Sequence, residues 1–520
     1  MVYERNRMRS LLYKCLSVLA LVSASSSVAS GQPWYVATSG SDSNNGSLGS
    51  PFRTIEKAVT AVKAGETIYV RGGTYSLTAT ITLSKSGTEN SLISMVAYPG
   101  EIPVLDFSGQ IQSAGSRGVV LTGSWWQIKG ISITGAGDNG MIISGGTNNR
   151  IEQCSFYRNR DSGLQIDNGA AANLIRNCDS YFNADPPENG NADGFAPKLT
   201  AGSGNSFYGC RAWRNSDDGW DGYLRGTNDI TTTLESCWSF ENGYLENGTD
   251  AGVNANGNGF KMGGSDDKAL EHNFILKNCL AFSNKSKGFD QNNNKGSMTL
   301  YNCSGHNNGG DNYRITQELA AGRVLTIKNC AELGGRVNIG TFAVQDKNSW
   351  LPPFVATAAD FRSTDPAGAT GPRKSDGTLP HIEYMHLVAG SDLIDAGVDV
   401  GLPFAGKAPD LGCFETGLTA AAGTMAPGST LLYPNPVSGT GYLRFTAPAG
   451  GRCEVWLFDV TGSRVAILTD LSIEPGEQTI RLDLTSIRDG VYICELRLSS
   501  KTIFRTRLIK SGYQLVHRRG

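Results

Sequence analysis

The sequence has no excess of charge of either sign, because 46 Lys and Arg residues nearly cancel 48 Asp and Glu residues. This balance gives no reason to expect a nucleic-acid partner. Aromatic residues are also scarce, at 9%, whereas glycine is abundant, with 65 of 520 residues. A near-neutral chain has no general affinity for an anionic polymer either, so any such preference must come from local charge.

A long apolar run is missing as well. Four basic residues precede the run LSVLALVSA (16–24), and the small residues Val28-Ala29-Ser30-Gly31 follow it. The basic residues are Arg5, Arg7, Arg9 and Lys14. The run is too short and too rich in serine to remain as a membrane anchor. Its flanks predict a signal peptide over residues 1–31 and a secreted mature chain that starts near Gln32. We expect the secreted protein to be a monomer.

Cysteine is not scarce, but its spacing argues against a disulfide framework. Six of the 11 cysteines are each followed five positions later by an asparagine. These pairs are Cys154/Asn159, Cys178/Asn183, Cys210/Asn215, Cys237/Asn242, Cys279/Asn284 and Cys303/Asn308. A unit of about two dozen residues, rich in Gly, Asn and short strand-like runs, predicts a parallel β-helix. In such a coil the thiols form an inward column of free cysteines, although the spacing of adjacent turns does not itself forbid a disulfide.

The asparagines of this pattern have a structural explanation. We expect each to lie at a bend between two sheets, where its amide bonds to the next turn and to local backbone. An aromatic residue or a histidine follows each cysteine by three positions. These residues are Tyr157, Tyr181, Trp213, Phe240, Phe282 and His306. We expect most of the aromatic residues to pack in a core before any of them serves as a substrate platform.

Four related phrases in the middle of the chain carry the candidate chemistry. They are NADGFAPK (191–198), DDGWDGY (217–223), GNGFKMGG (257–264) and KGFDQNN (287–293). Each places an aromatic residue directly after a glycine. Side chains alternate between the two faces of a strand, so these aromatics are predicted to point into the coil and their neighbours outward.

The alignment of the four phrases predicts which polar residues stack on adjacent turns. The residue before the glycine is Asp193, Asp218, Asn258 and Lys287 in turn, and the second residue after it is Ala196, Asp221, Lys261 and Asp290. Equivalent positions on successive turns are about 4.8 Å apart. Asp193 and Asp218 are therefore predicted to share one outer column, and Asp221, Lys261 and Asp290 a neighbouring one.

The fold class predicted from these patterns is all-β, a parallel β-helix over residues 32–417 followed by a small sandwich. Apolar residues at positions 55, 58, 59 and 62 have helical spacing and predict a helix that caps the first turn. Residues 334–417 lose the repeat, and we interpret them as a segment that wraps over the coil. Residues 418–430 have the composition of a linker. Residues 431–520 alternate apolar and polar side chains between turns, which predicts a separate β-sandwich.

Four carboxylates gather on two neighbouring turns of the predicted coil: Asp193, Asp217, Asp218 and Asp221. Such a group repels itself unless protons or a cation neutralise it. An all-oxygen set suits Ca²⁺, and no His/Cys set for Zn²⁺ accompanies it. The alternative is that DDGWD is a solvated turn without a ligand, which the stacking against Asp193 makes less attractive.

Lys261 is predicted to lie one turn beyond Asp221 on the same column. A lysine beside bound Ca²⁺ binds its proton less tightly and can act as a base; the alternative is a simple ion pair with Asp221 or Asp290. Calcium next to a lysine base suits β-elimination on a uronic acid, since the ion offsets the C6 carboxylate while the lysine removes the C5 proton. The polymer would lie along the outer face of the coil.

The four phrases, with the opening WYVATSGSDSNNGS (34–47) and the closing DLIDAG (392–397), resemble the pectate lyases of polysaccharide lyase family 9 over residues 33–417. The resemblance implies a right-handed parallel β-helix that cleaves (1,4)-α-D-galacturonan. It also implies Ca²⁺ held by Asp193, Asp217, Asp218 and Asp221, and Lys261 as the base. All five positions match. Because members of the family also act on other polyanionic glycans, a lyase on another uronic-acid glycan stays open.

The tail resembles a different family. YPNP (433–436), DVTG (459–462) and DGVYICEL (489–496) resemble the C-terminal sorting domains of the type IX secretion system. The resemblance implies that secretion machinery recognises the tail. It further implies export across both membranes of a Gram-negative bacterium, with the tail removed or anchored at the surface.

Two other functions remain open on the sequence alone. A glycoside hydrolase on the same coil would use paired aspartates, one as acid and one to activate water. A glycan-binding adhesin would use the coil without chemistry. The candidate substrate-binding residues are Arg225, Lys287, Asp290 and Arg314. Of these, the basic residues, together with Lys295, could pair with uronate carboxylates, although each is equally explained as an ordinary surface charge.

Overall fold

The computed structural model describes residues 33–417, 431–433, 437, 439–447, 450–459, 462–473, 476–499 and 501–510. The predicted signal peptide (1–31) and the predicted linker (418–430) lie outside the described residues. Among the described residues, no helix combines the length and apolar character needed to cross a membrane.

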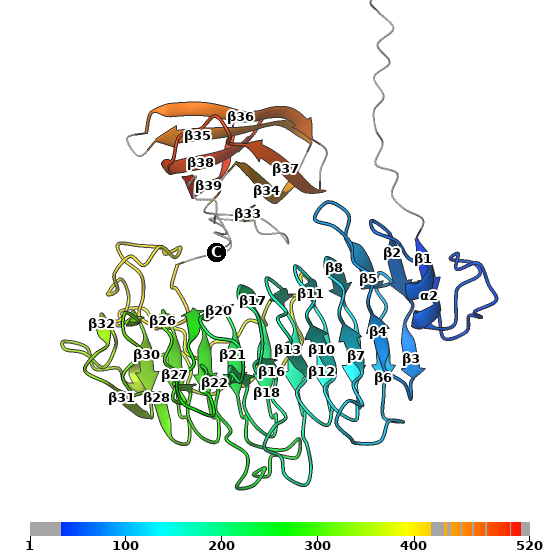
Figure 1. Ribbon diagram of the computed structural model, residues 1–520. Coiled ribbons are helices and arrows are strands. Elements are labelled where there is room, and N and C mark those ends of the chain that lie inside the picture. The colour runs from blue at the N-terminus through cyan, green and yellow to red at the C-terminus, as the bar shows by residue number, and fades with distance from the viewer. Residues whose placement is uncertain are drawn as a thin grey trace, which may run out of the picture.

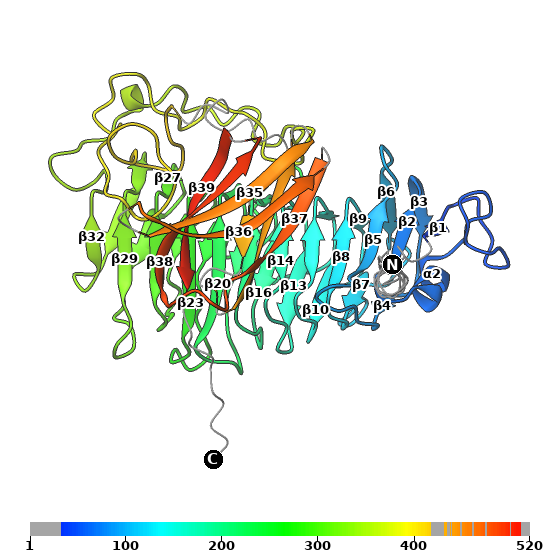
Figure 2. The ribbon, with the colours of Figure 1, turned by 90° about the horizontal axis from the view of Figure 1, so that it is seen from above.

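Residues 34–346 form a parallel β-helix whose successive turns build three sheets of twelve, ten and ten strands. Figure 1 shows the strands side by side along the coil, from β1 in blue to β32 in yellow-green, and Figure 2 shows the same succession from above. Every strand pair of the coil is parallel, as in the pairing of β10 with β13. The predicted parallel β-helix is therefore confirmed.

Sheet 1 has twelve strands: β1 (Trp34–Val36), β2 (Thr67–Val70), β5 (Ile93–Ala97), β8 (Trp126–Lys129), β11 (Arg150–Glu152), β14 (Leu174–Arg176), β17 (Asn205–Tyr208), β20 (Ile230–Glu235), β23 (His272–Lys277), β26 (Met298–Tyr301), β29 (Leu325–Lys328) and β32 (Val344–Asp346). Sheet 2 has ten: β3 (Gly73–Ser76), β6 (Pro103–Asp106), β9 (Ser132–Thr134), β12 (Ser155–Tyr157), β15 (Asp179–Tyr181), β18 (Arg211–Trp213), β21 (Trp238–Phe240), β24 (Leu280–Phe282), β27 (Ser304–His306) and β30 (Ala331–Leu333). Sheet 3 also has ten: β4 (Ile81–Leu83), β7 (Val119–Leu121), β10 (Met141–Ser144), β13 (Leu164–Asp167), β16 (Phe195–Pro197), β19 (Trp220–Asp221), β22 (Phe260–Lys261), β25 (Phe289–Asp290), β28 (Asp311–Ile315) and β31 (Arg336–Ile339).

The aromatic residues after the four glycines stack inside the coil, as predicted. Phe195 pairs with Trp220, Trp220 with Phe260, and Phe260 with Phe289. Their ring centroids are 4.8, 5.0 and 5.2 Å apart, and all four side chains are fully buried. Stacked rings of this kind add to the free energy gained by burying apolar area. They also lock the register of sheet 3, which places the polar residues beside them.

The asparagines of the C-x4-N pattern form a buried ladder at the bend between sheets 2 and 3. Asn242 Oδ1 accepts hydrogen bonds from the backbone N–H of Asn215 at 3.2 Å and from Asn215 Nδ2 at 3.0 Å. Asn242 in turn donates its own Nδ2 to Asn284 Oδ1 at 2.9 Å. The expected structural role is confirmed, and the ten described cysteines are all free and buried.

Asn242→Ala is expected to destabilise the coil by about 2–4 kcal/mol, because it leaves buried donors of Asn215 without an acceptor. The free energy of unfolding in denaturant measures the effect. Asn338→Ala, which removes an exposed asparagine from the last turn, is the matched control and should cost less than about 0.5 kcal/mol. Equal losses in the two variants would contradict a stabilising ladder.

Helix α2 (Ile55–Ala61) covers the first turn, as predicted. Its residues Ile55, Ala58 and Val59 are buried, and the Thr54 side chain caps its start by accepting from the Lys57 backbone N–H at 3.3 Å. Figure 1 shows the helix at the blue end of the coil. A solenoid needs such a cover because its terminal turn would otherwise leave apolar side chains in water.

The coil continues beyond the expected boundary at residue 334. Strand β31 pairs with β28, and β32 pairs with β29. The repeat pattern does not predict these strands, because Cys330 is not followed by an asparagine five positions later. Backbone pairing between strands does not require this pattern. The rest of the segment, with one short 3-10 helix η1 (Ala358–Asp360), packs Tyr384 and Leu387 against the outer aromatics of sheet 2.

The C-terminal residues form two antiparallel sheets around a core of their own. One sheet contains β33 (Leu431–Tyr433), β34 (Thr440–Ala447) and β37 (Gly476–Asp483); the other contains β35 (Gly451–Asp459), β36 (Arg464–Ile473), β38 (Gly490–Leu498) and β39 (Lys501–Lys510). Phe445 of the first sheet and Leu457 of the second are buried in the same apolar cluster. The predicted sandwich is confirmed.

Candidate metal and catalytic site

Three strands of sheet 3 position the candidate residues on its outer face. Asp221 ends β19, Lys261 ends β22 and Asp290 ends β25, and the three are in register on adjacent turns. Asp193 and Asp218 lie before the glycines that precede β16 and β19, and the Asp218 backbone N–H donates to Asp193 Oδ1 at 3.2 Å. Both predicted columns are therefore present.

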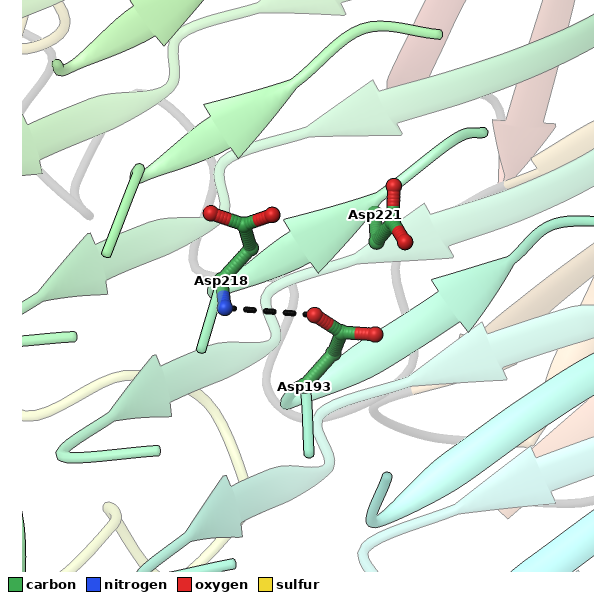
Figure 3. A group of neighbouring side chains, drawn as sticks. All are labelled: Asp193, Asp218 and Asp221. Carbon is green, nitrogen blue, oxygen red and sulfur yellow. Dashed lines mark hydrogen bonds between the residues drawn. The ribbon is translucent and has the colours of Figure 1, made fainter. Parts of the chain in front are cut away.

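Three of the four predicted carboxylates meet in one cluster (Figure 3). Asp193, Asp218 and Asp221 each offer an oxygen, and these oxygens lie within 4.8 Å of one another. All three residues are buried. We call this group the acid cluster.

Asp217 lies next to the acid cluster but turns its carboxylate elsewhere. Its Oδ1 accepts from the backbone N–H of Asn256 at 2.5 Å, and its Oδ2 lies 3.4 Å from Asn256 Nδ2. The sequence could not predict this contact, because Asn256 belongs to an inserted loop with no counterpart in the other phrases.

Lys261 contacts the acid cluster directly. Its Nζ lies 3.0 Å from Asp218 Oδ2 and 3.3 Å from Asp221 Oδ1. The approach to Asp218 lacks hydrogen-bond geometry, so this buried oxygen has no hydrogen-bond partner among the described residues. Nζ also lies 5.6 Å from the ring centre of Tyr223, within the range of a cation–π contact.

Lys198 is a site residue that the sequence reasoning missed. Its Nζ lies 2.6 Å from Asp193 Oδ2 and 3.5 Å from Asp221 Oδ2. A signal was available, since Lys198 follows Gly194 by four positions in the first phrase and Tyr223 follows Gly219 by four in the second. Extending the alignment by two residues would have placed both beside the predicted column.

Burial and neighbouring charges shift the pKa values of the three carboxylates of the acid cluster in different directions. Burial raises the pKa of Asp193 to about 8, with a further contribution from Asp221 and Asp218, although Lys198 opposes it. Burial likewise raises the pKa of Asp218. Burial would also raise the pKa of Asp221, but Lys261 and Lys198 outweigh it and hold this pKa below its usual value.

The same charges hold the proton on Lys261. Burial lowers its pKa, yet Asp218 and Asp221 raise it well above the ordinary value for lysine. A lysine in this state is an ion-pair partner and not a base. It can accept a proton only after another positive charge has offset the carboxylates.

The residues present fit a hard divalent cation. The donors are carboxylate oxygens, which suit Ca²⁺, and no histidine or cysteine belongs to the cluster. Asp218 Oδ2 is buried and, apart from its ion pair with Lys261, has no hydrogen-bond partner among the described residues, so a cation could take it as a ligand. Repulsion within the cluster and the raised pKa values of Asp193 and Asp218 are the electrostatic features that a bound cation would relieve.

Three of the residues predicted to bind uronate groups form ion pairs with neighbouring aspartates. Arg314 follows Asp290 on the column of Lys261, is 45% exposed and pairs with Asp311 at 2.8 Å. Lys287 pairs with Asp290 at 3.2 Å. Arg225 pairs with Asp266 at 3.2 Å on the loop that follows β19.

Lys295 is directed away from this face. Its Nζ donates to the backbone oxygen of Glu318 at 2.8 Å. Among the candidates, only Lys287, Asp290 and Arg314 therefore continue the line of the acid cluster along sheet 3.

Two inserted loops, residues 184–192 and 243–258, flank the acid cluster and contact each other. Asn189 Nδ2 donates to the backbone oxygen of Ala251 at 3.0 Å, and Asn254 Nδ2 donates to Glu188 Oε2 at 2.7 Å. These insertions explain why the repeat spacing varies. The second loop also contacts the acid cluster, because the backbone N–H and Nδ2 of Asn258 donate to Asp218 Oδ1 at 2.7 and 2.9 Å.

The fold and the site define a right-handed parallel β-helix protein with an acidic, lysine-containing site on its outer face. The chain belongs to the Pel9A-like right-handed β-helix family, whose model matches residues 34–330, and thus to a family of pectate lyases. Residues 431–510 match the model of the secretion system C-terminal sorting domain. Both resemblances seen in the sequence are confirmed, including the hand of the coil.

Known relatives cover most of the chain. Pectate lyase L of Dickeya chrysanthemi is 40% identical over 78% of this chain and 96% of its own length. The crystal structure of pectate lyase Pel9A matches with a TM-score of 0.69 and 39% identity over 74% of this chain and 96% of its own. A rhamnogalacturonan lyase structure matches with a TM-score of 0.62 and 27% identity over 70% and 98%.

Proposed function

We propose that the protein is a calcium-dependent pectate lyase that cleaves (1,4)-α-D-galacturonan by β-elimination. In this proposal Asp193, Asp217, Asp218 and Asp221 hold Ca²⁺, and Lys261 is the base. The observation that carries it is the contact of Lys261 with two members of the acid cluster, in a chain whose relatives are pectate lyases. A hydrolase would need paired carboxylates free to act as acid and base, whereas these are held by lysines.

Calcium and the side chains of the protein have different roles in the proposed reaction. Bound calcium would offset the charge of the aspartates and of the substrate C6 carboxylate, and so make the C5 proton more acidic. Lys261 would first release its own proton to solvent, as the added positive charge favours, and its neutral amine then accepts the C5 proton. The C–H electron pair forms the C4–C5 double bond, and the glycosidic oxygen leaves C4 and takes a proton from solvent. Tyr223 stands beside Lys261 Nζ and limits the directions from which the substrate approaches.

The column through Lys261 suggests how the polymer lies. Asp221, Lys261, Asp290 and Arg314 occupy successive turns, which are about 4.8 Å apart. Arg314 is half exposed and retains donors beyond its contact with Asp311. We propose that Arg314 and Lys287 bind uronate groups one or two sugars from the cleaved bond, and that Arg225 does so from the adjoining loop.

The deciding experiment follows ultraviolet absorbance while the protein acts on polygalacturonate with and without Ca²⁺. The proposal expects a calcium-dependent rise, because elimination leaves a 4,5-unsaturated uronide that absorbs. New reducing ends without absorbance would indicate a hydrolase. Binding without any product would indicate a glycan-binding adhesin.

A second substrate is supported by one finding. The rhamnogalacturonan lyase structure shares this fold at 27% identity. Rhamnogalacturonan therefore belongs in the same assay, and an absorbance rise on it alone would replace galacturonan as the substrate while leaving the elimination chemistry intact.

The protein is exported, as its C-terminal sorting domain indicates. We propose that the type IX secretion machinery of a Gram-negative bacterium recognises this domain and that the enzyme acts as a monomer on extracellular or surface-bound pectate. The signal peptide predicted over residues 1–31 supplies the first step of that route.

Calcium is expected to raise the melting temperature of the coil more at about pH 8.5 than at about pH 5.5. Asp193 has a pKa of about 8 when folded, against about 3.9 when unfolded. Because the folded pKa is the higher one, stability present at low pH is lost as the pH rises between these values, and calcium restores it only where the carboxyl is ionised. Thermal unfolding with and without Ca²⁺ at both pH values gives the answer, and equal increments would contradict it.

A further inference from the structure

Lys198 occupies the acid cluster on the side opposite Lys261. Lys198 bridges Asp193 and Asp221, whereas Lys261 bridges Asp218 and Asp221. The Lys198 side chain is only 10% exposed, and its remaining contact is the backbone oxygen of Asn191 at 3.4 Å. Its ammonium therefore lies against the oxygens that a metal ion would use.

The net charge of the site follows from this arrangement. The acid cluster and Asp217 carry four negative charges when ionised, and the two lysines reduce the net charge to −2, which one divalent cation would neutralise. Only Lys198 reaches Asp193, whose Oδ2 otherwise takes a hydrogen bond from Ser162 Oγ at 3.1 Å. Lys198 thus pairs with a carboxylate that Lys261 does not contact, and it does not touch the proposed base.

Lys198 is poorly placed for the reaction itself. In the described contacts its ammonium faces Asp193, Asp221 and the Asn191 carbonyl oxygen, and it makes no contact with Lys261, Tyr223 or Asp290. Lys198 is therefore placed to act on the reaction only through the metal ligands, as a positioning residue.

We propose that Lys198 is a built-in cation that competes with calcium for Asp193 and Asp221 and so weakens calcium binding. The inference rests on the proposed calcium site. Two positive charges in contact with the same carboxylates repel each other, and the buried setting screens this repulsion little. The consequence would be an affinity near the dissociation constants of about 10⁻⁴–10⁻³ M typical of extracellular calcium modules, which suits an exported enzyme.

The test is calcium titration of the full chain by isothermal titration calorimetry at about pH 8.5, where protons compete less with Ca²⁺ for the carboxylates than they do at neutral pH. Lys198→Met removes the charge and keeps the length of the side chain. Its dissociation constant for Ca²⁺ is expected to be at least about tenfold lower than that of the wild type. If this variant does not fold, Lys198→Gln removes the same charge and keeps a donor for Asp193.

Two matched variants separate charge from packing. Lys198→Arg keeps the charge and should leave the dissociation constant within about threefold of the wild type. Lys129→Met removes a charge from the exposed end of β8 in sheet 1 and should leave it within about twofold.

The outcomes distinguish the inference from the proposed function. A wild-type protein that binds no Ca²⁺ would overturn the proposed calcium site, and the inference with it. A wild type that binds Ca²⁺ while the Met and Gln variants bind it equally or more weakly would overturn the inference alone, because Lys198 would then only hold the aspartates in place. If Lys129→Met also binds Ca²⁺ more tightly, the inference is likewise overturned, because the effect would then not depend on the position of Lys198 in the acid cluster.

Discussion

Lys261→Ala is expected to lower kcat on polygalacturonate by at least about 10³-fold while leaving Ca²⁺ bound. The structure supplies the reason, since Lys261 is the amine in contact with Asp218 and Asp221 at the centre of the column. Lys261 lies on the outer face of sheet 3 and does not belong to the stack of aromatic rings inside the coil, so its loss should leave the coil folded. Ultraviolet absorbance measures turnover, and calorimetry measures calcium binding in the same preparation.

The controls for this variant test the role of the base. Lys129→Met, which removes a surface charge on sheet 1, should turn over polygalacturonate at the wild-type rate. Lys261→Arg keeps the positive charge but holds its proton far more tightly, and should be nearly as inactive as the alanine variant. Retention of more than about a tenth of wild-type kcat in Lys261→Ala would exclude this lysine as the base.

Removal of divalent ions with a chelator is expected to stop turnover, again by at least about 10³-fold, and added Ca²⁺ is expected to restore it. Without a cation, the carboxylates keep the proton on Lys261, as the raised pKa of this lysine indicates. The uncompensated acid cluster also repels the substrate carboxylates. Initial rates at increasing Ca²⁺ after chelation measure the dependence.

Substitution of a proposed calcium ligand tests the same dependence on calcium. Asp218→Asn removes a charge from the carboxylate whose Oδ2 has no hydrogen-bond partner among the described residues. It should raise the dissociation constant for Ca²⁺ by at least about tenfold, and more added Ca²⁺ should recover part of the activity. Full activity of the wild type in excess chelator would refute calcium dependence.

The register of sheet 3 could be predicted because it depends on a local signature. The Gly-aromatic pair repeats in each phrase, and stacking of the rings aligns one turn on the next. The bend asparagines add a second signature out of phase with the first. Two independent repeats leave one alignment of turns, so the register of Asp221, Lys261 and Asp290 follows from the sequence.

The inserted loops could not be predicted in the same way. Residues 184–192 and 243–258 have no equivalent in the other turns, so nothing in the repeat places Asn256 against Asp217 or Asn189 against Ala251. The second loop reaches the acid cluster at its last residue, where Asn258 donates to Asp218 Oδ1. Burial is the first cause of the raised pKa values of Asp193 and Asp218, and the repeat by itself does not predict it.

The sequence by itself determined the coil, its inward aromatics and asparagines, the outward column of acids with one lysine, and the separate C-terminal sandwich, because each depends on a short period that repeats along the chain. Only the tertiary structure decided that Asp217 turns toward Asn256, that Lys198 joins the acid cluster, and that the coil extends through β31 and β32. These features depend on contacts between side chains and loops that share no repeat, and such contacts exist only once the turns are stacked.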